Sequence, residues 1–208
     1  MKLYYLPGAC SLADLIVLQW IGEDHEPVRM DLGSLRSPDY LALNAGGTVP
    51  LLVHDDLSLT ENVAILGYLA DLHPEARLLG DGSPRARAEV MRWLGFLNSD
   101  VHKAFIPIFK PQRFLPDSSQ SSALADTARR HVSGYLKRLD EGLEGRNWLT
   151  GERSIADPYL FVLSRWAAAT KIDMRGLDNI ARFSEHMNSD SGVRTALALE
   201  SSLGEKTR

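Results

Sequence analysis

Cysteine is almost absent from this chain, because Cys10 is the only one among its 208 residues. A single cysteine excludes the intrachain disulfide framework by which small secreted domains compensate for a small core. The hydrophobic fraction of 44% is instead enough to bury a real core, as one large domain or two small ones. We therefore expect a fold that depends on side-chain packing and a thiol with no partner in the chain.

An excess of basic residues and a long apolar run are also missing. The net charge of −4 gives no reason to expect nucleic acid or an anionic membrane as a partner. No segment reaches transmembrane length, and the opening MKLYYLPGAC breaks at Pro7 before any secretory-type apolar run. The histidines show no metal-ligand spacing. These absences predict a cytoplasmic protein with no metal site.

The first 79 residues alternate between strand and helix patterns. We expect a buried strand at 2–6, a helix at 12–21 ended by Gly22, a second strand at 27–31, a hairpin formed by 51–53 and 57–60 around His54-Asp55-Asp56, and a helix from about Glu61. Mixed strands and helices of this length are typical of a small α/β domain. The predicted first domain is 1–79.

After Leu79 the strand patterns stop. Ser83 and Pro84 have the residue types of a helix N-cap and first turn. Two apolar stripes at helical spacing follow, within 90–101 and 124–143, and Ser154-Ile155-Ala156-Asp157 has the spacing of a capping box. Shorter helices are expected near 177–187 and 192–199. The sequence thus predicts an α+β protein whose second domain, 84–208, is all-helical.

Cys10 lies in YYLPGACSLADLIVLQW, where an apolar strand turns through Pro7-Gly8 into an amphipathic helix. A thiol at a helix N-terminus faces unpaired backbone N–H groups and the positive end of the helix dipole, which both favour the reactive thiolate. A lone cysteine is more commonly a small buried hydrophobe. The turn residues favour the reactive interpretation here, since they place Cys10 at the helix start and not on its core face. Tyr4 and Tyr5 also offer hydroxyls, but alternation along the strand lets at most one of them face the site, so we favour Cys10 and Ser11 over either.

Two further elements have residues suited to binding an amino-acid-like ligand. Val49-Pro50 precedes a strand, and a cis peptide bond there would leave the N–H and C=O of Val49 free to pair with an extended peptide; an ordinary trans-proline loop is the alternative. Glu61 offers a carboxylate to an ammonium group, and Asn62 offers an amide and an N–H at a helix start. Simple helix capping is the alternative for this pair.

The order and spacing of these three elements resemble the glutathione S-transferase family. The stretch YYLPGACSLA is similar to its bacterial beta class, and so is Val101-His102-Lys103-Ala104-Phe105 with Pro107 and Phe109. The resemblance covers nearly the whole chain. It implies a thioredoxin-like N-terminal domain, an all-helical C-terminal domain, a homodimer, and a detoxifying enzyme that uses glutathione as co-substrate.

The resemblance also implies a role for particular residues. Cys10 would lie against the glutathione sulfur with Ser11 beside it, and His102 would lie near the same sulfur. Val49 would pair with the ligand backbone next to cis-Pro50. The γ-glutamyl end would be held by Glu61, Asn62, Ser99 and Asp100, of which the last two can come from the other subunit. The apolar lining of an electrophile site would include Phe105, Ile106, Phe109, Phe114 and Leu115, which are equally plausible as core.

The chain departs from the family pattern at three positions. Leu35 stands where a lysine for the glycine carboxylate is expected, with Arg36 as a substitute; Gly95 replaces an asparagine, with Asn98 nearby; and Ala45 replaces a proline. Three functions stay open from the sequence. The first is conjugation of glutathione to an electrophile, the second is glutathione-dependent thiol–disulfide exchange at Cys10, and the third is non-catalytic ligand binding.

Overall fold

The computed structural model describes residues 1–115 and 117–201, and its contacts divide the chain into two compact units. The first unit begins at Met1, ends at Leu79, and also takes in the chain from Asn188. The second unit is Gly80–Met187. Among the described residues, no helix is both long and apolar enough to cross a membrane.

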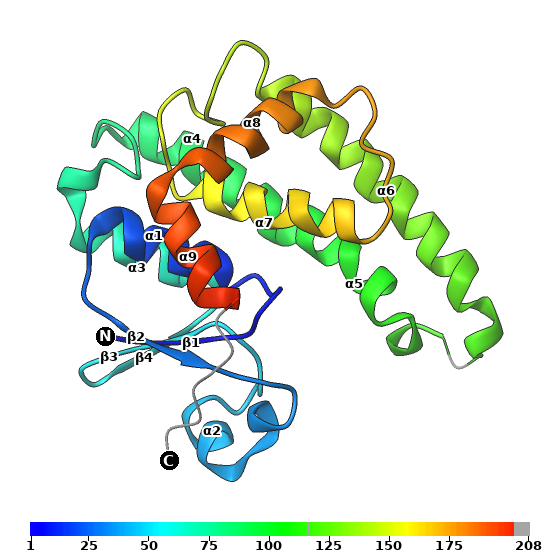
Figure 1. Ribbon diagram of the computed structural model, residues 1–208, viewed down its shortest axis with the longest axis horizontal. Helices are drawn as coiled ribbons and strands as arrows, with labels where there is room; N and C mark the ends of the chain where they lie inside the picture. Colours follow the sequence, from blue (N-terminus) through cyan, green and yellow to red (C-terminus); the bar gives the residue numbers. More distant parts are fainter. Residues whose placement is uncertain (116, 202–208) are drawn as a thin grey trace. The chain divides into compact units, whose positions relative to one another are not determined.

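The first unit is built on a four-stranded sheet in the order β2-β1-β3-β4 (Figure 1). Its strands are β1 (Lys2–Tyr5), β2 (Glu26–Arg29), β3 (Leu51–His54) and β4 (Leu57–Thr60). Strand β1 is parallel to β2 and antiparallel to β3, with Tyr4 opposite Leu51, and β3 is antiparallel to β4, with Leu51 opposite Thr60. The expected strands and hairpin are therefore confirmed, with ends shifted by one or two residues.

Helices cover both faces of this sheet (Figure 1). Helices α1 (Leu12–Ile21) and α3 (Asn62–Leu72) lie on one face, and α2 (Pro38–Leu43) lies on the other. Helix α1 ends at Gly22, which has a left-handed φ of 68° and donates its N–H to the carbonyl of Leu18. The apolar side chains of α1 from Leu12 to Leu18 are almost fully buried, so this helix is the central element of the core.

Helix α9 (Ser191–Ser201) packs against α1 in the first unit. Trp20 Nε1 donates a 2.9 Å hydrogen bond to Asp190, and the hydroxyl of Tyr5 donates to the carbonyl of Leu199 at 3.0 Å. Glu200 accepts from the N–H of Gly8 at 2.8 Å, which braces the turn that leads to Cys10. The expected second domain ran from 84 to 208, whereas these contacts group α9 with the sheet.

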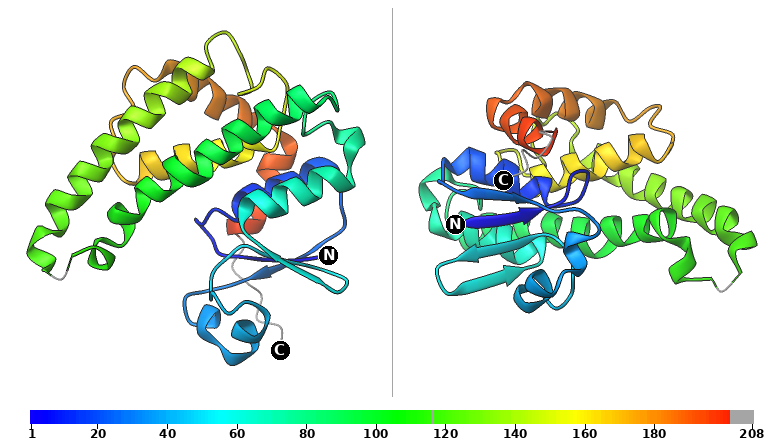
Figure 2. Two further views of the ribbon diagram at one scale, coloured as in Figure 1. Left: turned by 180° about the vertical axis from the view of Figure 1, so that it is seen from behind. Right: turned by 60° about the horizontal axis from the view of Figure 1, so that its bottom comes forward.

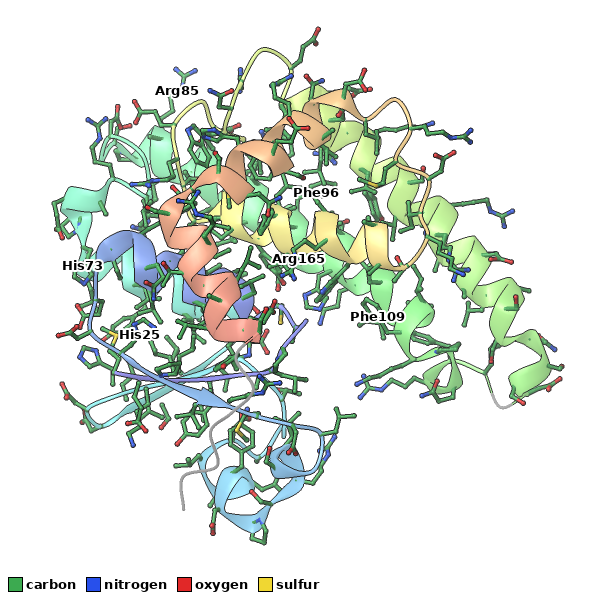
Figure 3. The ribbon with its side chains drawn as sticks, viewed as in Figure 1. His25, His73, Arg85, Phe96, Phe109 and Arg165 are labelled. Carbon is green, nitrogen blue, oxygen red and sulfur yellow. The ribbon has the colours of Figure 1, made fainter. Side chains whose placement is uncertain are left out.

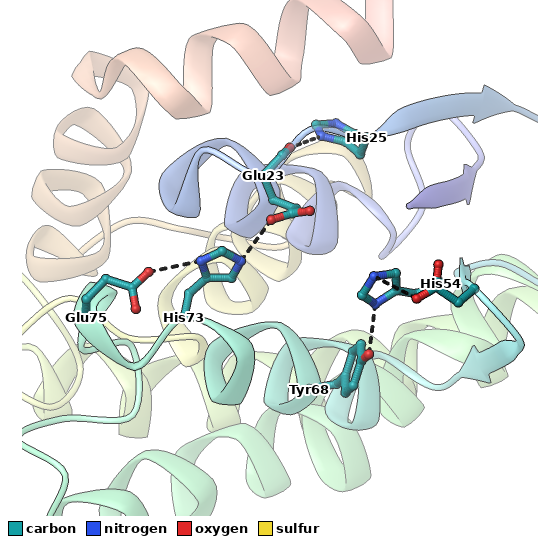
Figure 4. A network of polar contacts seen from close by, with 7 residues as sticks. Glu23, His25, His54, Tyr68, His73 and Glu75 are labelled. Carbon is teal, nitrogen blue, oxygen red and sulfur yellow. Dashed lines mark hydrogen bonds and ion pairs between the residues drawn. The ribbon is translucent and has the colours of Figure 1, made fainter.

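A polar network ties the far ends of α1 and α3 together (Figure 4). The two ring nitrogens of His73, just after α3, lie 3.0 Å from the carboxylates of Glu23 and Glu75. On β3, His54 bonds to the hydroxyl of Tyr68 on α3 at 2.8 Å. These contacts hold α3 against its neighbours and leave its N-terminus, at the opposite end, for the site described below.

The second unit is helical, as expected, and α5 and α6 run side by side in it (Figure 2). Its helices are α4 (Pro84–Phe96), α5 (Lys103–Phe109), α6 (Ser121–Gly142), α7 (Ala156–Ala169) and α8 (Asp178–Ser189), with a π-helical segment at Leu97–His102. Ser83 caps α4 by accepting from the N–H of Ala86, and Asp157 reaches back to the N–H of Ser154 at 2.8 Å. Both capping predictions are confirmed.

Candidate active site

Three loops of the first unit meet at one end of the sheet. Because Tyr4 pairs with Leu51 and Leu51 pairs with Thr60, the end of β1, the start of β3 and the end of β4 lie together. The loops at these three points carry Cys10, Val49-Pro50 and Glu61-Asn62. The register of the sheet therefore assembles the three elements that the sequence singled out.

Cys10 is buried, with 8% of its surface exposed, and its Sγ lies 3.9 Å from the carbonyl oxygen of Val49, to which the thiol donates. Burial raises the pKa of this thiol to about 12, and the nearby Asp14 carboxyl adds to the rise. The N–H groups of Cys10 and Ser11 oppose this shift but do not overcome it. The expectation that the helix start favours the thiolate is wrong, because desolvation outweighs the helix terminus.

Ser11 and Asn62 are placed in the interior of the site and not on its surface. The hydroxyl of Ser11 is fully buried, accepts from the N–H of Leu6 at 3.2 Å and lies 3.5 Å from the carbonyl of Leu6. The Asn62 amide donates to the carbonyl of Cys10 at 3.0 Å and to Asp14 at 3.1 Å. In contrast to the expected ligand contacts, both side chains fix the turn around Cys10. The backbone N–H of Asn62, at the first residue of α3, remains a candidate ligand group.

Asp14, four residues after Cys10, carries a buried carboxyl that no sequence pattern marked as part of the site. It has no exposed surface, and burial raises its pKa well above the ordinary value of an aspartic acid. Its Oδ2 accepts from Asn62, and its Oδ1 has no hydrogen-bond partner among the described residues. An acidic residue in the first turn of an otherwise apolar helix was the available signal, but such residues usually face solvent.

Val49 and Pro50 are joined by a cis peptide bond, which confirms that expectation. Among residues 1–115 and 117–201, the N–H of Val49 has no hydrogen-bond partner, so it is available to an extended ligand. The preceding loop is held by two side chains that donate to the carbonyl of Thr48, the hydroxyl of Tyr40 at 2.5 Å and the amide of Asn44 at 2.8 Å. Tyr40 and Asn44 therefore position the edge, although nothing in their sequence context marked them.

Glu61 occupies a backbone conformation that non-glycine residues rarely adopt, with φ 73° and ψ 120°. Its carbonyl accepts from the N–H groups of Ala64 and Ile65, while its side chain is exposed and makes no capping bond. The capping alternative is thus not what the structure shows. The exposed carboxylate stands at the N-terminus of α3, a place where backbone N–H groups attract a carboxylate of a ligand.

Leu35 belongs to the core, in contrast to its expected place in the ligand site. It is 7% exposed and packs in a cluster with Met30, Tyr40 and Leu51. The next residue, Arg36, is exposed, and its guanidinium lies so close to Gly47 that a Cβ there would be 2.6 Å from Nη1. Gly47 has a φ of +56°, and a Cβ there would also lie 3.0 Å from the carbonyl oxygen of Leu35, so the backbone conformation and this close approach favour glycine. Arg36 is therefore the basic group that borders the Val49 loop.

The second unit carries the remaining expected residues on its π-helical segment. Ser99 and Asp100 are exposed, and the Ser99 hydroxyl bonds to the carbonyl of Gly95 at 2.9 Å and to Asp100 at 2.5 Å. His102 is partly buried against Trp166, with ring centroids 4.8 Å apart. Burial lowers the pKa of His102 to about 4, with a smaller contribution from Lys103, so the ring is neutral at neutral pH. π-Helical turns of this kind are frequent at functional sites.

An aromatic cluster surrounds this histidine. Trp166 contacts Phe105 and Phe109 at centroid distances of 5.5 and 5.3 Å. Of the expected lining residues, Phe105 is fully buried and is core, whereas Phe109 and Phe114 are 46% and 52% exposed. Figure 3 shows Phe109 on α5. The exposed aromatic side chains are the ones that remain candidates for contact with an apolar substrate.

Comparisons with known proteins identify the family. The model of the glutathione S-transferase N-terminal domain matches residues 1–71, and that of the C-terminal domain matches 97–190. A glutathione S-transferase of Xanthomonas campestris is 45% identical over 96% of this chain and 98% of its own. The chain therefore belongs to the glutathione S-transferase family, and its expected fold of a thioredoxin-like domain followed by a helical domain is confirmed.

Solved structures agree with this assignment. A beta-class glutathione S-transferase of Sphingomonas chungbukensis is 37% identical, with a TM-score of 0.85, and the match covers 97% of this chain and 99% of the other. A sphingomonad glutathione S-transferase in complex with glutathione is also 37% identical, with a TM-score of 0.84 and coverage of 96% and 98%. The expected likeness to the bacterial beta class is confirmed.

Proposed function

We propose that this glutathione S-transferase family member binds reduced glutathione at the three loops of the first unit and conjugates it to an electrophilic, hydrophobic substrate. The observation that carries the proposal is the N–H of Val49, which has no hydrogen-bond partner in the part of the chain that the structure describes and lies beside the cis peptide bond, at the same end of the sheet as Glu61. An extended tripeptide would pair with Val49, place its ammonium on Glu61 and its adjacent carboxylate on the N–H of Asn62. Arg36 is the group suited to the glycine carboxylate.

The state of Cys10 favours conjugation over thiol–disulfide exchange. Exchange needs a thiolate as the attacking group, and a pKa of about 12 keeps Cys10 in the thiol form at neutral pH. A thiol is a weak hydrogen-bond donor, and the Cys10 thiol donates to Val49 O in the unliganded chain. When a ligand takes the Val49 carbonyl, the Cys10 S–H is released to donate to the glutathione thiolate. Glutathione loses its thiol proton to water, and its thiolate then attacks the electrophilic atom, forms the carbon–sulfur bond and displaces the leaving group.

The substitution Glu61→Gln tests the ligand site. The change keeps the shape of the side chain and removes the charge that would pair with the ligand ammonium. A charge-assisted hydrogen bond contributes roughly 1.5–3 kcal/mol, so calorimetric titration should find glutathione affinity reduced about 10- to 100-fold. The melting temperature without ligand should change little, because the Glu61 side chain makes no capping bond.

A matched control is Glu185→Gln, which changes an exposed glutamate on α8. This variant should bind glutathione as the unmodified protein does. Unchanged affinity in Glu61→Gln, with the fold intact, would show that the γ-glutamyl end binds elsewhere. No binding of glutathione by the unmodified protein would support the non-catalytic alternative.

Turnover separates the two enzymatic alternatives. A dinitrophenyl halide reports conjugation, and a glutathione mixed disulfide reports thiol–disulfide exchange. We expect the first activity to survive Cys10→Ser within about tenfold, since a hydroxyl is also a hydrogen-bond donor. Exchange as the main activity, abolished by the same substitution, would instead assign Cys10 as the nucleophile.

We also propose that the enzyme works as a cytoplasmic homodimer in detoxification, as the family resemblance implies. The charged rim of the dimer would include Asp55 and Asp56 in the β3–β4 turn and Arg85, Arg87 and Arg92 on α4. Ser99 and Asp100, which are exposed, would then be available to a ligand of the partner subunit. Light scattering at micromolar concentration should give twice the chain mass of 23.1 kDa. A mass of one chain would exclude the dimer.

A further inference from the structure

Among the described residues, His102 makes one side-chain hydrogen bond, and that bond joins it to a short chain of polar groups inside the helical unit. Its Nδ1 lies 2.6 Å from the hydroxyl of Tyr159, and that hydroxyl donates to Oδ1 of Asn98 at 2.9 Å. Tyr159 comes from α7 and is fully buried, whereas Asn98 and His102 are four residues apart on the π-helical segment. The three side chains thus connect two elements that are packed together.

The direction of these bonds determines where the histidine proton lies. An amide oxygen can only accept, so the single hydroxyl proton of Tyr159 is used on Asn98. The phenol oxygen can then only accept from His102, so Nδ1 must carry a proton. The ring is neutral because burial and Lys103 lower its pKa to about 4. A neutral imidazole has one N–H, so Nε2 is left as an unprotonated acceptor.

The other groups around the ring do not change this assignment. Trp166 packs edge-on against it from α7, and Lys103 is the charged neighbour on the chain. Lys103 has no lone pair when charged and cannot accept a proton from the ring. Among the residues that the structure describes, Nε2 of His102 has no hydrogen-bond partner. This nitrogen is also not one of the fully buried polar atoms that lack a partner, so it is not completely enclosed by protein.

We infer that Asn98 and Tyr159 are positioning residues that hold His102 as the Nδ1–H tautomer and present its Nε2 as a hydrogen-bond acceptor to a ligand. The group that this nitrogen takes is a donor such as a thiol, hydroxyl or ammonium, and not a thiolate or a carboxylate. The identification of that donor with the glutathione thiol, before this thiol loses its proton and becomes the thiolate to which Cys10 donates, rests on the proposed function. The tautomer itself does not.

The tautomer can be measured without any ligand. Long-range proton–nitrogen correlation spectra of protein labelled in its histidine rings report which nitrogen is protonated, and a His102→Gln sample assigns the signals. At neutral pH we expect a protonated Nδ1 and an unprotonated Nε2. An Nε2–H ring, a mixture of tautomers or a charged ring in the unmodified protein would overturn the inference.

Substitutions of Asn98 test the direction of the chain. Asn98→Asp keeps an acceptor for Tyr159 and should keep the Nδ1–H tautomer. Asn98→Ala removes the acceptor, so the buried hydroxyl turns its proton to Nδ1 and the ring should change to the Nε2–H form. Retention of Nδ1–H in Asn98→Ala, or its loss in Asn98→Asp, would contradict the inference. A merely structural role of Asn98 would not move the ring proton.

Kinetics then link the tautomer to the reaction. In Asn98→Ala and Tyr159→Phe we expect kcat for conjugation to fall about tenfold, the lower end of the effect known for residues that orient metal-bound histidines, while KM for glutathione changes little. Tyr135→Phe on α6 is the control, because its hydroxyl makes no hydrogen bond among the described residues. Unchanged kcat in both variants would refute the ligand-facing role of Nε2. If the unmodified protein neither binds nor conjugates glutathione, the proposed function fails, and the spectra still decide the tautomer.

Discussion

Each of the two units buries one aspartic acid in the first turn of a helix, and the two carboxyls have different surroundings. Asp157 on α7 accepts from the N–H of Leu149 and from both the N–H and the hydroxyl of Ser154, at 2.8–2.9 Å. Among the side chains that the structure describes, Asn62 is the one that donates to the Asp14 carboxyl. Both are fully buried.

This difference in donors decides what each carboxyl does. Burial raises the pKa of Asp157 to about 6, against three donors that lower it, so this residue is ionised at neutral pH and caps its helix. Burial also raises the pKa of Asp14 well above its ordinary value, and a backbone N–H group opposes that rise. The donors that surround each buried carboxyl therefore decide how far its pKa rises.

The largest effect is expected on the alkylation rate of Cys10, whose thiol lies near Asp14. The pKa of Cys10 is raised from 9.0 to about 12, so the thiolate fraction at neutral pH is about a thousandfold below that of an ordinary thiol. Alkylation by iodoacetamide, followed by intact mass, should be slower by about that factor than for the same cysteine in the urea-unfolded chain.

The control for the Cys10 experiment is Asp14→Asn. It keeps the burial of Cys10, which is the larger cause of the raised pKa, and removes the smaller contribution of the Asp14 carboxyl, so alkylation of the folded protein should stay slow. Rapid alkylation of the folded protein would contradict the buried thiol. A large acceleration in Asp14→Asn would show that Asp14 is ionised, and the contrast with Asp157 would disappear.

The next largest effect is expected for Asp157→Asn. An amide offers one accepting oxygen, so its NH₂ group must face the N–H of Leu149 or the donors of Ser154. A buried donor without an acceptor costs about 1–3 kcal/mol, and the lost charge adds to this. Urea unfolding should show a decrease of about 3 kcal/mol in the free energy of unfolding. A decrease below about 1 kcal/mol would mean that these donors find other acceptors.

The smallest effect is expected for Asp14→Asn, which should change the free energy of unfolding by less than about 1 kcal/mol at low pH, since the amide resembles the neutral acid.

The pH dependence of the free energy of unfolding gives a second measurement at the same residue. The folded-state pKa of Asp14 is raised, so the unfolded chain binds fewer protons above about pH 4. Stability of the unmodified protein therefore falls as pH rises toward the folded-state pKa of Asp14. Asp14→Asn should remove this loss and become relatively more stable with rising pH; the opposite trend would show a stabilising carboxylate.

The sequence determined the family, the fold class and most elements, because their signals are local. Gly22 ends α1, Ser83 and Asp157 cap their helices, and the apolar periods of α4, α6 and α7 follow directly from residue order. The three site loops were also identifiable, since turn residues and helix starts are visible in a single chain. The cis peptide bond at Pro50 was expected only through the family resemblance.

Only the tertiary structure decided which side chains of those loops are available to a ligand. Ser11, Leu35 and Asn62 are buried by partners that lie far along the chain or on the opposite side of a turn, and burial reverses the expected pKa shift of Cys10. The association of α9 with α1 depends in the same way on contacts about 170 residues apart, such as Trp20 with Asp190. Desolvation and hydrogen-bond satisfaction are properties of the assembled interior. A sequence fixes which groups exist and where helices begin, but the dielectric surroundings and donor supply of each group arise only when distant segments pack together.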